Sequence, residues 1–138
     1  MNYKNKSIFQ SFQVAANGVS EAFRGQKNLR VHLLLSVIAA GLGIYFNLDS
    51  VEWGLLWTAV FAVVICELLN TAIEAVVDMV TAEFHPLAKI AKDVAAGAVL
   101  LSAFFSLIIA YLLFLHRFVT LFCGGSFPFI FSCILSHN

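Results

Sequence analysis

Residues 66–78 read Cys-Glu-Leu-Leu-Asn-Thr-Ala-Ile-Glu-Ala-Val-Val-Asp, an apolar run that carries three carboxylates. On a helix that advances about 100° per residue, the polar side chains of this run fall on one narrow stripe. The members of the stripe are Glu67, Asn70, Thr71, Glu74 and Asp78. An ionisable residue inside a membrane helix costs about 2.5–3.5 kcal/mol on insertion scales, so three on one stripe need partners, a metal ion or water. The pattern predicts an active site or a transport site.

The acidic stripe is also deep. At about 1.5 Å per residue, Glu67 lies about 10 Å along the helix axis from Glu74, whereas Glu74 and Asp78 are about 6 Å apart. Glu67 cannot easily share one ion with Asp78. We therefore expect two roles along the stripe rather than one cluster.

The composition indicates an integral membrane protein. The chain has 138 residues, of which 61% are hydrophobic and 12% charged, and its mean hydropathy is +0.91. A soluble domain is closer to half apolar and a quarter charged. The formal net charge of +0 gives no case for nucleic acid binding. The 3 cysteines show neither metal-ligand spacing nor an even-numbered disulfide set.

The predicted fold is all-α, with an N-terminal interfacial amphipathic helix and three transmembrane helices. The amphipathic helix covers 8–24, and the spans cover about 31–48, 51–80 and 94–115. The helix at 8–24 could lie in the headgroup plane or pack against the spans. A polar linker at 25–32 leads into the first span.

The second span is expected to end before Pro86, which cannot continue a helix interior. After this break, Lys89, Lys92 and Asp93 open the third helix. The aromatic tail at 118–138 could form a fourth, irregular span or an interfacial or disordered segment, and no function is assigned to it.

The basic residues predict the orientation. Five precede the first span, none separates the first span from the second, and two lie between the second and the third. The positive-inside rule then places the N-terminus and the 81–93 loop in the cytoplasm. The carboxylates of the second span approach the same face, so the polar groups converge on one level of the membrane.

A carboxylate-rich pocket at the inner interface suits a hard cation with oxygen ligands, above all Mg²⁺. Phosphoryl transfer needs a metal ion, a cation for phosphate charge and a carboxylate near the accepting hydroxyl. Here Glu74 would bind the metal ion, Lys92 would bind phosphate, and Glu67 would be the carboxylate near the lipid hydroxyl. No P-loop occurs. The competing hypothesis is a small ion-coupled transporter or channel that relays cations through the same acids. A membrane scaffold is a third class, but it gives no reason for the acids to share a face.

Two stretches carry a resemblance to a known family. Residues 67–78 contain Glu-x-x-Asn-x-Ala-x-Glu-x-x-x-Asp, and residues 83–99 read Glu-Phe-His-Pro-Leu-Ala-Lys-Ile-Ala-Lys-Asp-Val-Ala-Ala-Gly-Ala-Val. Both resemble the prokaryotic diacylglycerol kinases, a family that includes undecaprenol kinases. The resemblance covers about 8–116, so we expect a lipid kinase domain at 1–117. It implies a homotrimer in the bacterial inner membrane, with ATP and Mg²⁺ used at active sites shared between subunits near the cytoplasmic face.

The resemblance also implies roles for single residues. Glu67 matches the general base for the lipid hydroxyl, and Glu74 matches a metal-binding glutamate. The positions that match the lining of the nucleotide and transfer site are Asn70, Asp78, Lys92 and Asp93, with Asn70 also near the lipid substrate.

Three basic or polar positions near the start of the first span carry alternatives. A second metal-binding glutamate of the family is replaced here by Gln26, which offers an oxygen without charge, and Glu21 could substitute for it. Arg30 could grip nucleotide phosphates bidentately or act as a positive-inside anchor. His32 could contact a headgroup or phosphate, or be an interfacial side chain.

The acceptor is predicted from resemblance alone. His85-Pro86-Leu-Ala-Lys and Asn28-Leu-Arg-Val-His look more like the undecaprenol kinase branch, so undecaprenol is favoured and diacylglycerol comes next. His85 itself is interpreted as a loop or capping residue, and Lys89 as a solvated or lipid-phosphate contact.

Overall fold

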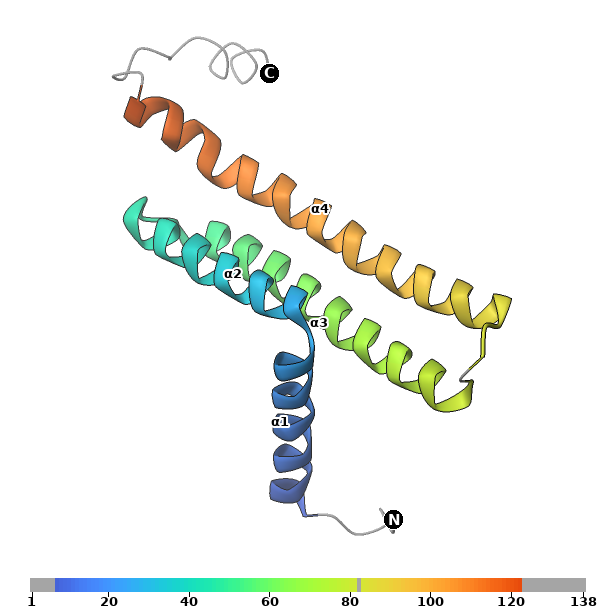
Figure 1. Cartoon of the computed structure of the whole chain (residues 1–138). Coiled ribbons are helices and arrows are strands. Elements are labelled where there is room, and N and C mark those ends of the chain that lie inside the picture. The colour runs from blue at the N-terminus through green and yellow to red at the C-terminus, as the bar shows by residue number, and fades with distance from the viewer. Residues whose placement is uncertain (1–6, 82, 123–138) are drawn as a thin grey trace, which may run out of the picture.

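The computed structural model describes residues 7–81 and 83–122, and the regular structure in these ranges is helical. The helices are α1 (Ile8–Gly25), α2 (Lys27–Tyr45), α3 (Ser50–Val80) and α4 (Pro86–Phe122). Figure 1 shows α2, α3 and α4 side by side as an up-and-down bundle, with α1 leaving it at a steep angle. The most extensive packing is between α3 and α4.

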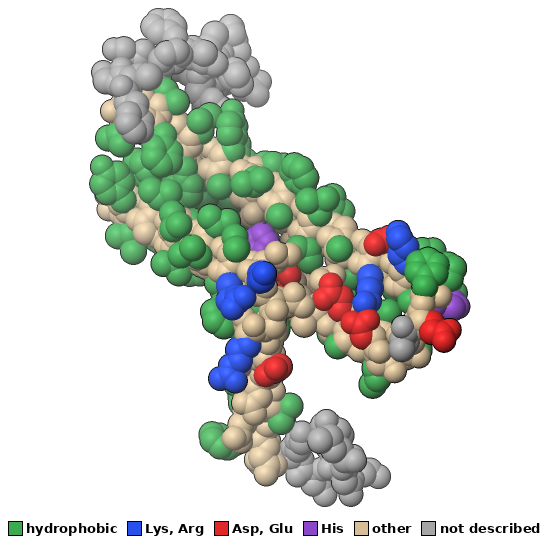
Figure 2. All heavy atoms as spheres, in the orientation of Figure 1, with side chains coloured by type: hydrophobic (Ala, Val, Ile, Leu, Met, Phe, Trp, Pro, Cys, Tyr) green, Lys and Arg blue, Asp and Glu red, His purple; other side chains and the backbone are tan. Residues whose placement is uncertain are grey.

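Helices α2, α3 and α4 are long and apolar enough to cross a membrane. Large hydrophobic side chains such as Leu34, Val37 and Leu101 are exposed on the bundle, and green side chains cover much of it in Figure 2. A soluble bundle would turn these side chains inward, whereas lipid tails are as apolar as the side chains themselves. The predicted all-helical membrane fold with three spans is confirmed.

Helix α1 is the predicted amphipathic helix. Ser7 caps it, accepting from the Gln10 backbone while the Gln10 side chain accepts from Ser7. Its apolar residues Ile8, Phe9 and Phe12 are exposed. Because α1 crosses the direction of the spans (Figure 1), it has the orientation that a helix in the headgroup plane requires.

The predicted polar linker at 25–32 is wrong. Helix α1 continues to Gly25 and α2 begins at Lys27, so Gln26 alone separates them, with extended backbone angles of φ −101° and ψ 117°. The polar side chains of 27–32 are compatible with helical backbone, and hydropathy marks where a helix becomes apolar rather than where it starts. Helix α2 consequently begins four residues before the predicted start of the first span at 31.

The turn between α2 and α3 is tight. The first span ends at Tyr45 and not at Leu48, because Asn47 takes the left-handed conformation (φ 51°) that asparagine tolerates. Leu48 then folds back, donating its backbone N–H to the Gly43 carbonyl at 3.0 Å. Asp49 caps α3 by accepting from the backbone N–H groups of Val51 and Glu52 at 2.8 and 2.9 Å.

The hydrophobic core lies at this turn and the adjoining part of α4. Its buried members are Leu48, Leu56, Ala59, Ile109, Leu113 and Phe114. At its edge, Arg117 donates to both carboxylate oxygens of Glu52 at 2.8 and 2.9 Å, which ties the end of α4 to the start of α3. The best-packed end of the bundle is therefore remote from the acidic half of α3.

The connection between α3 and α4 follows the sequence prediction. Thr81 ends α3 in extended backbone, and α4 begins at Pro86. His85 caps α4, accepting at Nδ1 from the Leu87 backbone at 3.2 Å, which confirms its capping role. Helix α4 runs through Phe122, beyond the predicted end of the third span at 115, and the rest of the tail lies outside the described residues.

Candidate active site

Glu67 is the most enclosed polar side chain of the acidic stripe. It lies in the middle of α3 and is 2% exposed. His32 of α2 faces it, with Nε2 at 3.4 Å from Oε1 of Glu67. The contact does not have hydrogen-bond geometry, and Oε1 has no hydrogen-bond partner among the described residues. A buried carboxylate oxygen without a donor is costly, so this oxygen is available for a ligand or a proton.

Glu74, two turns further along α3, sits among amides. Its Oε1 accepts from Asn70 Nδ2 at 2.9 Å, and its Oε2 accepts from Gln26 Nε2 at 3.2 Å. Gln26 reaches α3 because it occupies the break between α1 and α2. The structure thus brings together Glu74 and Gln26, the two residues predicted to hold a metal ion.

Asn70 lies between Glu67 and Glu74 on the same face of α3. It lies one turn after Glu67, is 9% exposed and directs its amide nitrogen to Glu74. Its own Oδ1 is buried and has no hydrogen-bond partner within the described residues. Two buried oxygens without donors, on Glu67 and Asn70, therefore lie on one face of α3.

The third acid, Asp78, belongs to a separate and more exposed group. It accepts from Lys92 Nζ of α4 at 2.5 Å, and its side chain is 66% exposed. Lys89 pairs with Asp93 one turn away at 2.6 Å. In Figure 2 acidic and basic side chains gather on this end of the molecule, beside the connection between α3 and α4. Each acid of the stripe thus has its own neighbours, and the two roles expected from the axial spacing stay a prediction.

Arg30 is not brought to the carboxylates. It is exposed on α2, and no hydrogen bond or ion pair joins it to α3 in the part of the chain described. Within the same residues, no three His, Cys, Asp or Glu side chains form a metal-binding group. Any metal site here would combine Glu74 with amide oxygens and with oxygens of a bound substrate.

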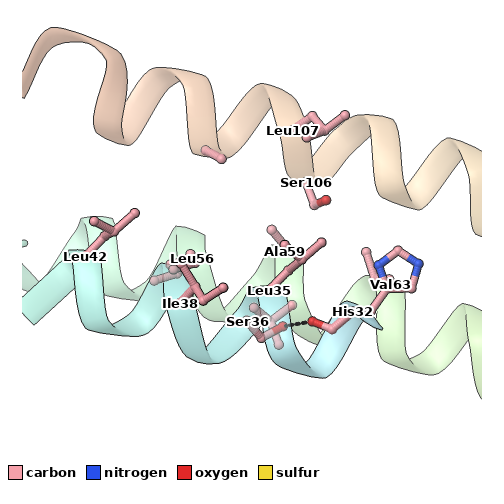
Figure 3. Close-up of a pocket in the computed structure, with 13 residues that line it drawn as sticks. His32, Leu35, Ser36, Ile38, Leu42, Leu56, Ala59, Val63, Ser106 and Leu107 are labelled. Atoms are coloured by element: carbon pink, nitrogen blue, oxygen red, sulfur yellow. Dashed lines mark hydrogen bonds between the residues drawn. The ribbon is translucent and has the colours of Figure 1, made fainter. Parts of the chain in front are cut away.

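An apolar cavity of about 210 Å³ begins beside His32 and runs between α2, α3 and α4. Its walls include Leu35, Leu56 and Val63. Figure 3 shows residues of the three helices around this space, with Ser106 of α4 pointing toward α2 and α3. The cavity therefore has a hydrocarbon-like interior and a histidine at one end.

The sequence did not predict the contact between His32 and Glu67. For His32 the interpretations were a headgroup or phosphate contact, or an interfacial side chain. Its actual partner is 35 positions away and on another helix. In the sequence, the one signal for this contact is a histidine near the start of a span that precedes the acidic span.

Fold and site together define a small helical integral membrane protein with a buried carboxylate beside an apolar cavity and an exposed charged cluster at the end of the bundle. Comparison with known proteins narrows this class. The family model for "Prokaryotic diacylglycerol kinase" matches residues 13–114. The chain belongs to the prokaryotic diacylglycerol kinase family, and it is a lipid kinase of a bacterial membrane.

Individual relatives agree with this assignment. The chain is 41% identical over 110 residues to the undecaprenol kinase of Bacillus subtilis. This alignment covers 80% of this chain and 89% of that relative. It is 40% identical over 116 residues to a diacylglycerol kinase of Synechocystis, covering 83% and 66% of the two chains. With the diacylglycerol kinase of Escherichia coli K12 the identity is 34% over 85 residues, covering 62% and 70%. The alternative of an ion-coupled transporter or channel is not retained.

Proposed function

We propose that this lipid kinase transfers the γ-phosphoryl group of ATP, with Mg²⁺, to the hydroxyl of a membrane alcohol at the cytoplasmic face. Undecaprenol is the favoured acceptor and diacylglycerol the next. The observation that carries the proposal is the buried Glu67 carboxylate, which has an oxygen without a hydrogen-bond partner among the described residues. This oxygen lies 3.4 Å from His32, which lines one end of an apolar cavity. A hydrocarbon chain in that cavity would bring its polar end toward His32 and Glu67.

In this proposal Glu67 is the general base. A carboxylate within hydrogen-bond reach of an alcohol can take its proton as the oxygen attacks phosphorus. Burial keeps water away from Glu67, so the lipid hydroxyl does not compete with solvent for the carboxylate. Asn70 supports the same site, because its free Oδ1 can accept from the acceptor hydroxyl.

Glu74 and Gln26 are the proposed metal-binding pair. Magnesium is commonly held by one or two carboxylates plus substrate phosphates, and it keeps several waters. One carboxylate and one amide oxygen from this chain fit that requirement, with phosphate oxygens completing the set. When bound, Mg²⁺ would neutralise charge on the transferring phosphate.

The proposed nucleotide and phosphate contacts are Asp78, Lys92, Asp93 and Arg30. Lys92 can exchange its pairing with Asp78 for a phosphate, since an exposed ion pair contributes little and its partners separate readily. Asp93 is paired with Lys89 one turn away, so the start of α4 presents both charges together. Arg30 is exposed at the start of α2, where a bidentate phosphate contact is available to it.

The choice of undecaprenol is supported by the relative from Bacillus subtilis, whose alignment covers most of both chains. Other relatives at similar identity are diacylglycerol kinases, which keeps diacylglycerol as the second acceptor. The cytoplasmic orientation of the N-terminus and of the site rests on the distribution of basic residues, and the homotrimer on the family resemblance.

The test is a phosphorylation assay with protein reconstituted in vesicles, offered undecaprenol and diacylglycerol side by side with labelled ATP. We expect magnesium-dependent label in lipid, with undecaprenol the better acceptor by kcat/KM. Label in diacylglycerol alone would overturn the acceptor preference. Absence of label in both lipids, in vesicles where the protein is folded, would overturn the proposed function.

A further inference from the structure

Because Glu67 is buried, a proton that it accepts as general base needs a route away from the carboxylate. A general base that gains a proton in each turnover must lose it before the next. Glu67 is 2% exposed, so water cannot readily take that proton from the carboxylate itself. The inference below rests on the proposed function, because it assumes that Glu67 is the base.

His32 is the titratable side chain in contact with Glu67. Its Nε2 lies 3.4 Å from Glu67 Oε1, and its side chain is 23% exposed, against 2% for Glu67. Imidazole can accept a proton on one nitrogen and release one from the other. His32 thus touches the buried oxygen and is itself less enclosed than Glu67.

The surroundings leave His32 suited to this task. Opposite it, α3 presents Glu67, with Glu74 two turns further on and held by two amides. On the other side of the cavity, α4 contributes the hydroxyl of Ser106. Ser36 donates to the His32 carbonyl at 2.8 Å, a backbone contact that leaves the imidazole unengaged (Figure 3).

We infer that His32 is a positioning and proton-exchange partner of Glu67, which holds the buried carboxylate and passes its proton to water after each transfer. The lipid oxygen forms a bond to the γ-phosphorus while the bond from that phosphorus to the β-phosphate oxygen breaks, and its electron pair leaves with the nucleoside diphosphate. The hydroxyl proton goes to Glu67. It then moves from Glu67 to Nε2 of His32, and the imidazolium releases a proton to water. Proton exchange with water between the two ring nitrogens then restores an unprotonated Nε2 for the next turnover.

The decisive variant is His32→Gln, which keeps an amide able to hold the carboxylate but cannot carry a proton. The measurement is a rapid-mixing time course of lipid phosphate formed per active site. We expect a first turnover within about twofold of wild type, followed by a steady state slowed by about 10²-fold or more, the range that proton-transfer groups contribute. The progress curve should therefore show a burst of one product per site.

A second variant, His32→Ala, removes the imidazole and leaves space for a small molecule. Added imidazole should restore its steady-state rate and should not accelerate wild type. His116→Gln is the matched control, because it makes the same change on an exposed histidine of α4 away from the site. It should show neither a burst nor a lower rate.

A steady-state rate of His32→Gln within about twofold of wild type would overturn the inference. Equal slowing of the first and later turnovers, without rescue of His32→Ala by imidazole, would also overturn it and would show a structural role. Both results presuppose an active wild-type enzyme and an inactive Glu67→Gln. Failure of either of those two controls would count against the proposed function itself and not specifically against His32.

Discussion

At the residue scale, the amide of Gln26 in place of a carboxylate lowers the negative charge beside Glu74. The two side chains meet at 3.2 Å, with a neutral amide facing a single carboxylate. The resemblance places a second glutamate at position 26, and this chain has none there. The site therefore has one negative charge fewer with which to attract a divalent cation.

Restoring that charge should tighten the dependence on magnesium. In Gln26→Glu, we expect the Mg²⁺ concentration for half-maximal rate to fall several-fold, because two carboxylates attract the ion more strongly than one. In Glu74→Ala it should rise by about 10–100-fold or more, since loss of a direct ligand should exceed the effect of losing an outer partner. A magnesium titration of initial rates measures both.

Gln13→Glu is a suitable control for added charge, because Gln13 is exposed on α1 and outside the site. It should leave the titration unchanged. If Gln26→Glu also leaves it unchanged, then Gln26 does not occupy the metal position. An unshifted titration for Glu74→Ala would remove Glu74 from metal binding.

Single residues were predictable where the helix period sets their position. The stripe from Glu67 to Asp78 follows from spacing along one helix. Contacts between helices were not predictable in the same way. His32 meets Glu67 across 35 positions, and Arg117 meets Glu52 across 65, and both distances depend on how the helices pack.

At the scale of elements, the turn between α2 and α3 depends on close approach at Gly43. A Cβ at this position would lie 2.9 Å from Leu48 Cδ1 and 3.0 Å from Trp53 Cη2. The leucine tip can move, whereas the Trp53 indole is stacked on Trp57. The absence of a side chain at Gly43 therefore leaves the space that Leu48 needs to fold back into the core.

Gly43→Ala should destabilise the protein by about 1–3 kcal/mol, the usual cost of an overpacked core. Gly41→Ala is the matched control on the same helix, since a Cβ there meets nothing within 4 Å. It should be neutral or stabilise by up to about 1 kcal/mol through helix propensity. The midpoint of thermal unfolding in detergent compares the two, and equal midpoints would contradict the packing argument.

Element types were predicted better than element ends. The spans and the break at Pro86 follow from hydropathy and from the missing proline N–H. The prediction of a linker at 25–32 is wrong because polar composition does not by itself indicate a loop, and lysine and arginine are good helix formers. Only the extended Gln26 interrupts the chain there, and this single residue is what lets its amide reach Glu74.

At the scale of the whole molecule, one chain encloses only part of the polar face of α3, because Glu67 and Asn70 are buried whereas the Asp78 side chain is 66% exposed. Exposed apolar side chains such as Ile65, Leu69 and Ile73 share that helix with Glu67 and Asn70. A neighbouring copy could cover part of this surface and complete the site, as the family resemblance implies.

We therefore expect the purified protein to be a homotrimer in mild detergent, which the mass from light scattering with size exclusion can establish. Activity should be lost when the trimer is diluted or solubilised to monomers, because shared sites are broken. A monomer that retains full phosphoryl transfer would contradict this expectation. A stable dimer would contradict the trimer alone.

The most direct test of the account is Glu67→Gln, which removes the charge and basicity of the buried carboxylate and keeps its shape. We predict that ATP-dependent phosphorylation of undecaprenol in vesicles falls by about 10²-fold or more in kcat, while nucleotide binding and the oligomer are retained. Full activity of purified Glu67→Gln would contradict the claim that this carboxylate accepts the proton of the lipid alcohol.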